Sequence, residues 1–504
     1  MSDTQQVFDV VVVGSGGGAL TAAHLAQKRG LRTVVVEKTD KLGGTSAYSG
    51  GACWLPGSVV QQRAGIGDST DSAREYLGAL LPDPDTDKVE AFLAEAPRLV
   101  DELEADPAME FEWLPFPEYF DAPGRVGWGR SIQPVNIRRD ELPEAVAGLV
   151  RPPVERDRAG LAGRNTLSGG QSLIARLAWA FTRDGGTVLT GHTVDTLTTD
   201  SGRVTGVEAA TDGGRVTITA TRGVVVASGG FEHNPAWRAQ YGVPGDAAWS
   251  MAPDGTNAGE PIAAAQAIGA ATDLLDQGWF CPGLEHPDGH GSFTLGFRSG
   301  VIVDADGRRY ANESLPYDRF GREMAKAPER IPSWFVFDSR EGGRLPAIAM
   351  PEGDPAEHLA AGTWVRADTL DELATALGLT DLVATVARFN GYCETGVDEE
   401  FGRGDDEYDT FFTGGDGPNK ALVGVTQAPF YAARFVLSDL GTKGGIVTDA
   451  RGRALRKDGS VIAGLYATSN SAANAFGPLY PGPGAPLGTA MVFGSLAVQD
   501  LAES

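Results

Sequence analysis

A short apolar run that leads directly into consecutive glycines, close to the start of the chain, constrains the fold most. Residues 10–13 are all valine, a pattern typical of a parallel strand that is buried on both faces. A glycine-rich turn and a segment with helical spacing of alanine and leucine follow, and a second valine-rich run at 33–36 ends on Glu37. The order strand, glycine turn, helix, strand and acid predicts a βαβ unit that binds a dinucleotide.

Each small residue of this turn has a predicted role. Gly14 permits the tight turn, Gly16 lets the backbone approach a pyrophosphate, and Ala19 is small enough for the helix to pack on the strand. The start of the helix offers N–H groups and the positive end of its dipole to phosphate. Glu37 is expected to accept hydrogen bonds from ribose hydroxyls, which argues against a 2′-phosphate on the nucleotide.

Composition narrows the possible partners and the compartment. The formal net charge of -25 argues against nucleic-acid binding and against electrostatic docking on anionic membranes. The three cysteines (Cys53, Cys281 and Cys393) are far apart and match neither a metal-site spacing nor a disulfide framework, which favours a reducing compartment. Without a signal-like segment or a run long enough to span a bilayer, the sequence predicts a cytoplasmic protein with at most peripheral membrane association.

The loop after Glu37 is a second candidate contact with the nucleotide. Residues 43–44 and 50–51 are glycine pairs that bracket small residues, among them Thr45 and Ser46. Such a loop lets the backbone lie against a flat cofactor while the hydroxyl groups donate hydrogen bonds. We therefore expect this loop to contact the cofactor.

An aromatic segment at 111–120 leaves two interpretations open. Pro115 and Pro117 exclude a regular helix there. Phe116 and its neighbours could form a small satellite core under a loop, or an apolar wall for a ligand in which Tyr119 carries a polar tip.

The sequence pattern of the chain changes near residue 277, and the earlier pattern returns at residue 441. At 504 residues the chain is long enough for two or three structural domains. We predict a discontinuous nucleotide-binding domain of residues 1–276 and 441–504, interrupted by a substrate domain of residues 277–440. Within the first domain we expect helices at 71–104, 171–182 and 488–502, a small antiparallel layer of strands at 187–189, 204–207 and 216–220, and a further buried strand at 224–226.

Four stretches together resemble the flavoproteins of the fumarate reductase and succinate dehydrogenase superfamily. They are the N-terminal glycine fingerprint and residues 43–46, 227–231 and 464–470. The resemblance spans nearly the whole chain and implies an α/β fold, with FAD as the cofactor of a discontinuous Rossmann-like FAD-binding domain and with an inserted α+β catalytic (cap) domain. It implies these cofactor contacts: Gly14, Ser15, Gly16, Gly17, Gly18, Ala19, Glu37, Lys38, Gly43, Gly44, Thr45, Ser46, Gly50, Gly51, Val194, Ala227, Ser228, Gly229, Asn470, Leu487 and Gly488.

Three further stretches narrow the resemblance to the 3-ketosteroid Δ1-dehydrogenases. These are residues 118–120 with Pro123 and Gly124, residues 312–318, and the Tyr-Pro-Gly-Pro-Gly sequence of residues 480–484, which is the most specific of the three.

The narrower resemblance implies a role for each of four residues toward a 3-ketosteroid substrate. The Tyr480 hydroxyl and the Gly484 N–H would hold the C3 carbonyl oxygen. Tyr317 would take the C2 proton, assisted by a hydrogen bond from Tyr119, and the C1 hydride would go to flavin N5. Phe116 and Phe293 are expected to line the substrate site, and an external acceptor, quinone-like or other, would reoxidise the flavin.

Three alternatives stay open. A fumarate-reductase-like enzyme would need arginine and histidine to bind a dicarboxylate. Residues 441–445 read Gly-Thr-Lys-Gly-Gly where a His-Thr-x-Gly-Gly pattern would be expected, so Gly441 replaces the histidine and we rank this alternative lower. A Δ4 or other ring-position ketosteroid dehydrogenase differs only in where the tyrosines meet the steroid. A flavin carrier without catalytic activity would need no apolar pocket and no base.

Overall fold

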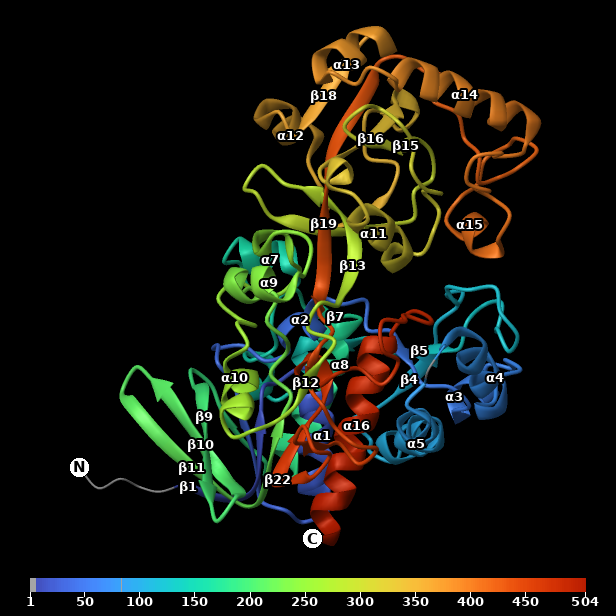
Figure 1. Ribbon diagram of the computed structural model, residues 1–504. Helices are drawn as coiled ribbons and strands as arrows, with labels where there is room; N and C mark the ends of the chain where they lie inside the picture. Colours follow the sequence, from blue (N-terminus) through green and yellow to red (C-terminus); the bar gives the residue numbers. More distant parts are fainter. Residues whose placement is uncertain (1–5, 83) are drawn as a thin grey trace. The chain divides into compact units, whose positions relative to one another are not determined.

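The computed structural model describes residues 6–82 and 84–504 and has the mixed α/β fold that the sequence predicts (Figure 1). No helix within these two ranges combines the length and the apolar character needed to cross a membrane.

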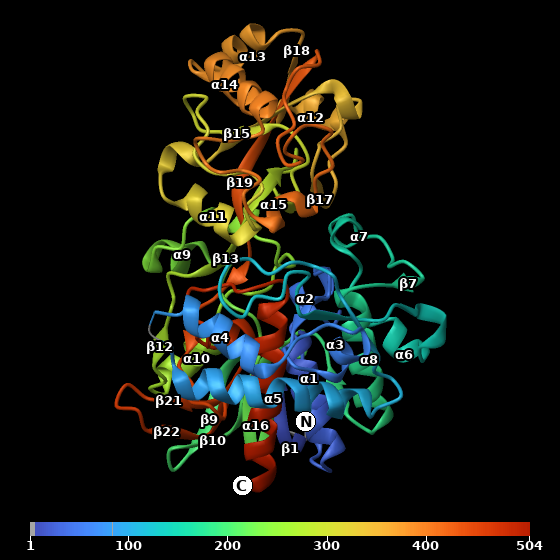
Figure 2. The same ribbon diagram turned by 90° about the vertical axis from the view of Figure 1, so that its right-hand side faces the viewer.

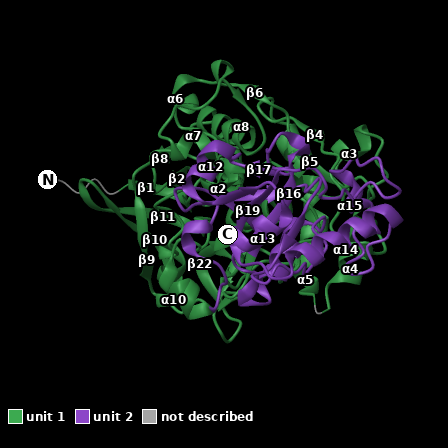
Figure 3. Ribbon diagram, turned by 90° about the horizontal axis from the view of Figure 1, so that it is seen from above, with its two compact units in different colours: residues 1–241, 252–278, 441–504 green, residues 242–251, 279–440 purple. Residues whose placement is uncertain are grey.

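The chain divides into two compact units, coloured separately in Figure 3. Unit 1 consists of Met1–Tyr241, Ala252–Gly278 and Gly441–Ser504, and unit 2 consists of Gly242–Met251 and Trp279–Leu440.

Five parallel strands form the centre of unit 1. Their order is β22 (Val461–Ala467), β11 (Gly214–Val226), β1 (Gln6–Val13), β2 (Thr33–Val36) and β8 (Thr187–Leu189). β21 (Arg453–Leu455) adds an antiparallel edge, and β10 (Arg203–Thr211) and β9 (Thr193–Asp200) extend the sheet from β11. The valines of β1 are buried because the strand pairs on both sides, which explains the apolar run.

The strand predictions were partly wrong. The segments at 216–220 and 224–226 are one strand, β11, whose first half pairs antiparallel with β10 and whose last residues pair parallel with β1 and β22. Gly223 lies between the two predicted segments, and a Cβ there would be 2.9 Å from the Gly464 carbonyl oxygen, so close strand packing requires glycine. The segment at 187–189 is β8, which pairs with β2 and not with the antiparallel layer.

Three helices of unit 1 pack together beside this sheet. They are α1 (Gly17–Lys28), α8 (Gly170–Arg183) and α16 (Ala485–Glu503), which agree with the predicted helices. A Cβ on Gly18 would lie 2.8 Å from the Ala490 carbonyl oxygen, so α1 and α16 approach too closely for a side chain at that position.

The predicted helical segment at 71–104 is two helices. They are α4 (Thr70–Leu80) and α5 (Thr86–Glu104), and α5 packs against α16 (Figure 2). The other short elements of unit 1 are α2 (Gly44–Tyr48), β3 (Cys53–Trp54), α3 (Val59–Arg63), β4 (Phe111–Trp113), β5 (Ser131–Pro134), β6 (Ile137–Arg138), α6 (Glu144–Ala147), α7 (Val154–Arg158), β7 (Thr166–Leu167), α9 (Pro235–Tyr241), α10 (Glu260–Ala267), β12 (Thr272–Asp273) and β20 (Gly445–Ile446).

Unit 2 is built on a second, seven-stranded sheet. Its order is β15 (Val301–Val303), β16 (Ser333–Asp338), β19 (Phe430–Thr442), β13 (Gly278–Glu285), β14 (Gly291–Leu295) and β17 (Ile348–Met350), with β18 (Trp364–Ala367) paired to β19. Its helices are α11 (Tyr317–Ala325), α12 (Pro355–Ala361), α13 (Leu370–Leu377), α14 (Leu382–Thr395) and α15 (Glu407–Phe411). The core forms where Leu373 of α13 and Phe389 of α14 pack with the valines of β15.

Candidate active site

The carboxyl ends of β1 and β2, together with residues that follow β11, open onto a pocket in unit 1. This is where open α/β sheets bind their ligands. The pocket is lined by fourteen of the predicted cofactor residues: Gly14, Ser15, Gly16, Glu37, Lys38, Gly43, Gly44, Thr45, Ser46, Val194, Ala227, Ser228, Gly229 and Asn470.

The glycine turn has the geometry that a bound diphosphate requires. Gly14 has φ of +100°, and a Cβ there would lie 2.5 Å from the Ala227 carbonyl oxygen. Gly16 is the residue before α1, so the backbone at the positive end of the helix dipole lies at the pocket. These residues fit the pyrophosphate of FAD.

Glu37 is held at the end of β2 by three hydrogen bonds. Ser15 Oγ donates to its Oε2 at 2.5 Å, and the N–H and hydroxyl of Thr39 donate to its Oε1 at 2.9 and 3.0 Å. Glu37 as a whole is 7% exposed, and it lines the pocket. It is therefore fixed in orientation beside the site where a ribose is expected.

Sequence reasoning missed eleven residues that line the same pocket. They are Val13, Val36, His192, Thr193, Gly230, Thr256, Asn257, Gly259, Glu260, Pro261 and Ser469. One of them, Thr193, is the first residue of β9, and His192 directly precedes it; this strand was not predicted because its threonines and aspartates obscure its alternation. Three others, Gly259, Glu260 and Pro261, lie at the start of α10. This Gly-Glu-Pro sequence was the signal that could have identified them.

Seven predicted cofactor residues lie outside the lining of this pocket: Gly17, Gly18, Ala19, Gly50, Gly51, Leu487 and Gly488. At several of these positions, two segments of the protein pack too closely for a side chain to fit. A Cβ on Gly17 would lie 2.9 Å from the Leu487 side chain, and one on Gly488 would lie 2.3 Å from the Trp54 carbonyl oxygen.

Tyr119 and Tyr480 come together in unit 1 although they are far apart in the sequence. Their ring centroids are 5.2 Å apart, at an interplanar angle of 63°, and the residues are 1% and 3% exposed. Phe116 packs edge-on against Tyr119 at 6.3 Å. The aromatic segment at 111–120 therefore contributes to a buried cluster around two phenol groups.

The segment that follows Tyr480 is bonded to β3 and β5. Ser131 Oγ donates to the Pro483 carbonyl at 2.5 Å, and the Trp54 N–H donates to the Gly484 carbonyl at 3.1 Å. Gly484 has φ of +85°, and a Cβ there would lie 2.3 Å from the Ala52 carbonyl group. Glycine is thus the only residue that fits at the entry to α16.

Tyr317 is the first residue of α11 in unit 2 and is 6% exposed. Its ring packs edge-on against Phe293 of β14, with centroids 4.7 Å apart. Tyr317 and the predicted wall residue Phe293 are therefore neighbours.

The residues before Tyr317 form a buried ion-pair network. Glu313 accepts from Arg309 at 2.7 and 2.8 Å and from Arg403 at 3.1 Å. Arg309 also donates to both oxygens of Asp398, at 3.0 and 2.8 Å. These side chains support the segment that leads into α11.

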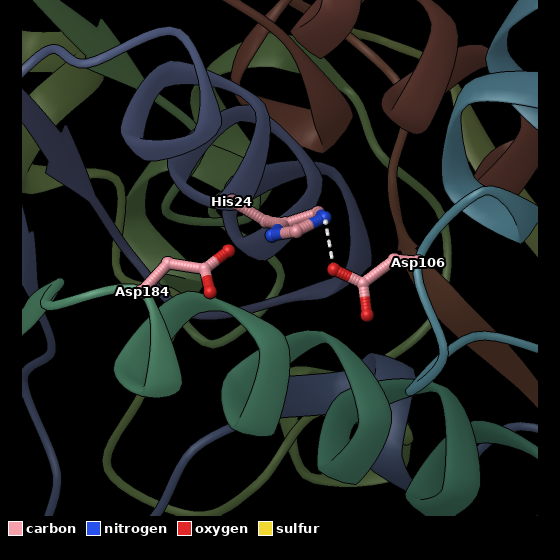
Figure 4. Close-up of side chains that lie close together, drawn as sticks. All are labelled: His24, Asp106 and Asp184. Atoms are coloured by element: carbon pink, nitrogen blue, oxygen red, sulfur yellow. Dashed lines mark ion pairs between the residues drawn. The ribbon is translucent and has the colours of Figure 1, made fainter.

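A second polar cluster lies where α1, α8 and the end of α5 meet. His24 lies between Asp106 and Asp184, with its Nε2 3.7 Å from an Asp106 oxygen (Figure 4). Arg183 already pairs with both carboxylates, at 2.6 Å to Asp106 and 2.9 Å to Asp184. Because this arginine supplies the positive charge, we interpret the cluster as an ion-pair connection between helices.

Comparison with known proteins identifies the family. A model of the FAD binding domain matches residues 9–487. The chain is 40% identical to 3-oxosteroid 1-dehydrogenase from Rhodococcus opacus, over 100% of both chains. It is 34% identical to 4-oxocyclohexanecarboxylate 2-dehydrogenase from Sinomonas cyclohexanicum, over 99% of this chain and 93% of the relative.

A solved structure agrees with these relatives. The crystal structure of 3-ketosteroid delta1-dehydrogenase from Sterolibacterium denitrificans, in complex with 1,4-androstadiene-3,17-dione, superposes with a TM-score of 0.88 at 31% identity, covering 99% of this chain and 100% of that one. The full-length identity and the FAD-binding match together show that this chain belongs to the 3-oxosteroid 1-dehydrogenase family of FAD-dependent flavoproteins.

Proposed function

We propose that this chain catalyses the FAD-dependent 1,2-dehydrogenation of 3-ketosteroids. The observation that carries the proposal is the buried pair Tyr119 and Tyr480 beside the Gly484 turn, in a chain that is 40% identical along its whole length to a 3-oxosteroid 1-dehydrogenase.

Unit 1 is proposed to be the discontinuous Rossmann-like FAD-binding domain and unit 2 the inserted α+β catalytic (cap) domain. The residues that line the pocket of unit 1, with the glycine turn at the pyrophosphate and Glu37 at the ribose, would hold the cofactor. FAD, when bound, supplies the acceptor for the hydride that leaves C1.

Tyr480 and Gly484 would hold the substrate's C3 carbonyl oxygen. A C2 proton becomes acidic only as negative charge moves onto that oxygen, so the phenol O–H and the backbone N–H would stabilise the enolate. Losing one such donor typically costs about 10²–10³ in rate.

Tyr317 would take the C2 proton. The pKa of a tyrosine is ordinarily about 10, so the phenol needs a donor or a positive field that lowers its pKa. Tyr119 is proposed to provide the hydrogen bond. Phe116 and Phe293, which pack edge-on against these two phenols, would be apolar walls for the steroid.

A second candidate substrate is 4-oxocyclohexanecarboxylate, because a relative named for its dehydrogenation is 34% identical to this chain over 99% of its length. Both substrates carry a ketone next to the carbon that loses its proton. They differ in that the smaller one has a carboxylate, for which the protein would have to provide a cation.

Anaerobic mixing of the purified flavoprotein with each ketone tests the proposal. Androst-4-ene-3,17-dione should bleach the yellow flavin and 4-oxocyclohexanecarboxylate should not, and product analysis should show a C1–C2 double bond. Bleaching by a saturated dicarboxylate such as succinate but not by the steroid, or a double bond at another ring position, would contradict the proposal. The physiological acceptor, expected to be quinone-like or another external oxidant, and the cytoplasmic location stay predictions.

The variant Tyr317→Phe tests the proposed base. Removing a general base typically costs about 10²–10⁴ in rate, so kcat should fall by that factor while bound FAD, measured by absorbance, is retained. Turnover equal to that of the wild type would mean that another group takes the proton.

A further inference from the structure

We propose that Tyr76 is a positioning residue for the pair Tyr119 and Tyr480. Its single hydroxyl group joins the two chain segments that carry these phenols. This inference rests on the proposed function, because it assigns Tyr76 a role in the same site.

Tyr76 lies on α4 and is fully buried. Its hydroxyl donates to the Pro481 carbonyl at 2.8 Å and accepts from the Phe120 N–H at 3.1 Å. Phe120 directly follows Tyr119, and Pro481 directly follows Tyr480. One side chain is thus bonded to the backbone neighbour of each phenol-bearing residue.

A direct backbone bond completes this arrangement. The Tyr119 N–H donates to the same Pro481 carbonyl at 3.1 Å. That oxygen therefore receives one bond from Tyr119 itself and one from Tyr76. Both bonds connect the segments that carry the two phenol rings, whose centroids are 5.2 Å apart.

The surroundings of Tyr76 prevent it from following a displaced loop. The Arg130 guanidinium lies 5.6 Å from the centre of its ring, and Arg130 is itself held by Glu118 at 2.7 Å and by Asp68 at 2.9 Å. A Cβ on Gly124 would lie 2.7 Å from the Tyr76 nitrogen, so the backbone is also tightly enclosed. Burial raises the pKa of Tyr76, and the nearby Glu118 charge raises it further, which keeps the hydroxyl protonated as a donor.

The consequence for catalysis follows from geometry. A misplacement of about 1 Å in a catalytic group can cost about 10²-fold in rate. Tyr76→Phe removes the bridge but keeps the ring that packs on Arg130. We therefore expect kcat to fall at least about tenfold, while steroid binding and FAD binding change little.

Tyr466 offers a matched control. It is also nearly buried, at 5% exposed, and its hydroxyl makes one bond, to Asp500 Oδ2 at 2.8 Å. Tyr466→Phe deletes the same atom from the same unit without touching the segments of Tyr119 or Tyr480.

The experiment compares the FAD-loaded wild type, Tyr76→Phe and Tyr466→Phe with androst-4-ene-3,17-dione. A positioning role predicts a loss in kcat for Tyr76→Phe only, with KM within about threefold of the wild type and with unchanged flavin content. If the two variants have the same kcat, within twofold, the inference is wrong. Absence of turnover by the wild type would instead overturn the proposed function, and this inference with it.

Discussion

The carbonyl groups that follow Tyr480 in unit 1 and the segment that precedes Tyr317 in unit 2 are held by different kinds of interaction. The carbonyl groups of residues 481–484 accept hydrogen bonds from neutral donors, among them Tyr76 and Ser131. The segment before Tyr317 is held by buried charges, in which Glu313 pairs with two arginines.

The difference predicts two kinds of response to substitution. A neutral hydrogen bond contributes about 0.5–1.5 kcal/mol to stability, whereas breaking a buried ion pair by removing one partner costs about 3–5 kcal/mol. Changes near Tyr480 should therefore alter the geometry of a folded protein, while changes before Tyr317 should reduce the stability of unit 2 itself.

Glu313→Gln is expected to have the largest effect on stability. The substitution removes the negative charge that pairs with Arg309 and Arg403, and the side chains of both arginines are fully buried. Urea unfolding should show a loss of about 3–5 kcal/mol.

Asp368→Asn is the control for that variant. Its partner Arg366 lies at 2.9 Å, but the two side chains are 73% and 46% exposed, so we expect a loss of about 0–1 kcal/mol. Equal losses in Glu313→Gln and Asp368→Asn would remove the distinction between the two segments.

Tyr480→Phe should have the next largest effect. This effect should be on the catalytic rate and not on stability. Deleting one of two donors to the enolate oxygen should lower kcat by about 10²–10³. The melting temperature should stay close to that of the wild type because the ring keeps its packing against Tyr119. Steady-state kinetics together with thermal unfolding separate the two quantities, and a large drop in melting temperature with normal turnover would contradict this view.

The smallest effect is expected from the substitution of two buried histidines, one in each unit, and it concerns the pH dependence of stability. Burial lowers the pKa of His24, and it lowers the pKa of His358 to about 4, with the charge of His286 adding to the shift. Because both pKa values are below the unfolded value of about 6.5, the unfolded chain binds the protons more readily. The stability that the two neutral histidines contribute is therefore fully present above about pH 6.5, and it is lost as the pH falls toward their pKa values in the folded protein.

The variants His24→Gln and His358→Gln should each reduce the loss of stability between pH 7 and pH 5. The reduction should be larger for His358→Gln, whose pKa is lowered to about 4. Urea unfolding at the two pH values measures the difference, and a variant that is as pH-sensitive as the wild type would exclude its histidine as the cause.

Several features could be predicted from the sequence because they are local. The valine runs, the glycine turn and Glu37 lie within one βαβ unit, and all of them appear at the pocket or in the strands beside it. A buried central strand must be apolar on both faces, so its pattern is visible without knowledge of its partners.

Other features were invisible in the sequence because they depend on contacts between distant segments. β11 continues through Gly223, which packs closely against β22, and β8 joins the sheet through β2. The sequence within a strand does not show which distant segment of the chain the strand pairs with.

The sequence by itself determined the dinucleotide-type βαβ unit and, through its resemblance, the family and the candidate tyrosines. Only the tertiary structure decided that Tyr119 and Tyr480 pack against each other and that Tyr76, 405 residues before Pro481, is bonded to the backbone beside both. The physical reason is that a buried hydroxyl finds its partners through the packing of α4 against two loops, and no spacing within the chain encodes that packing.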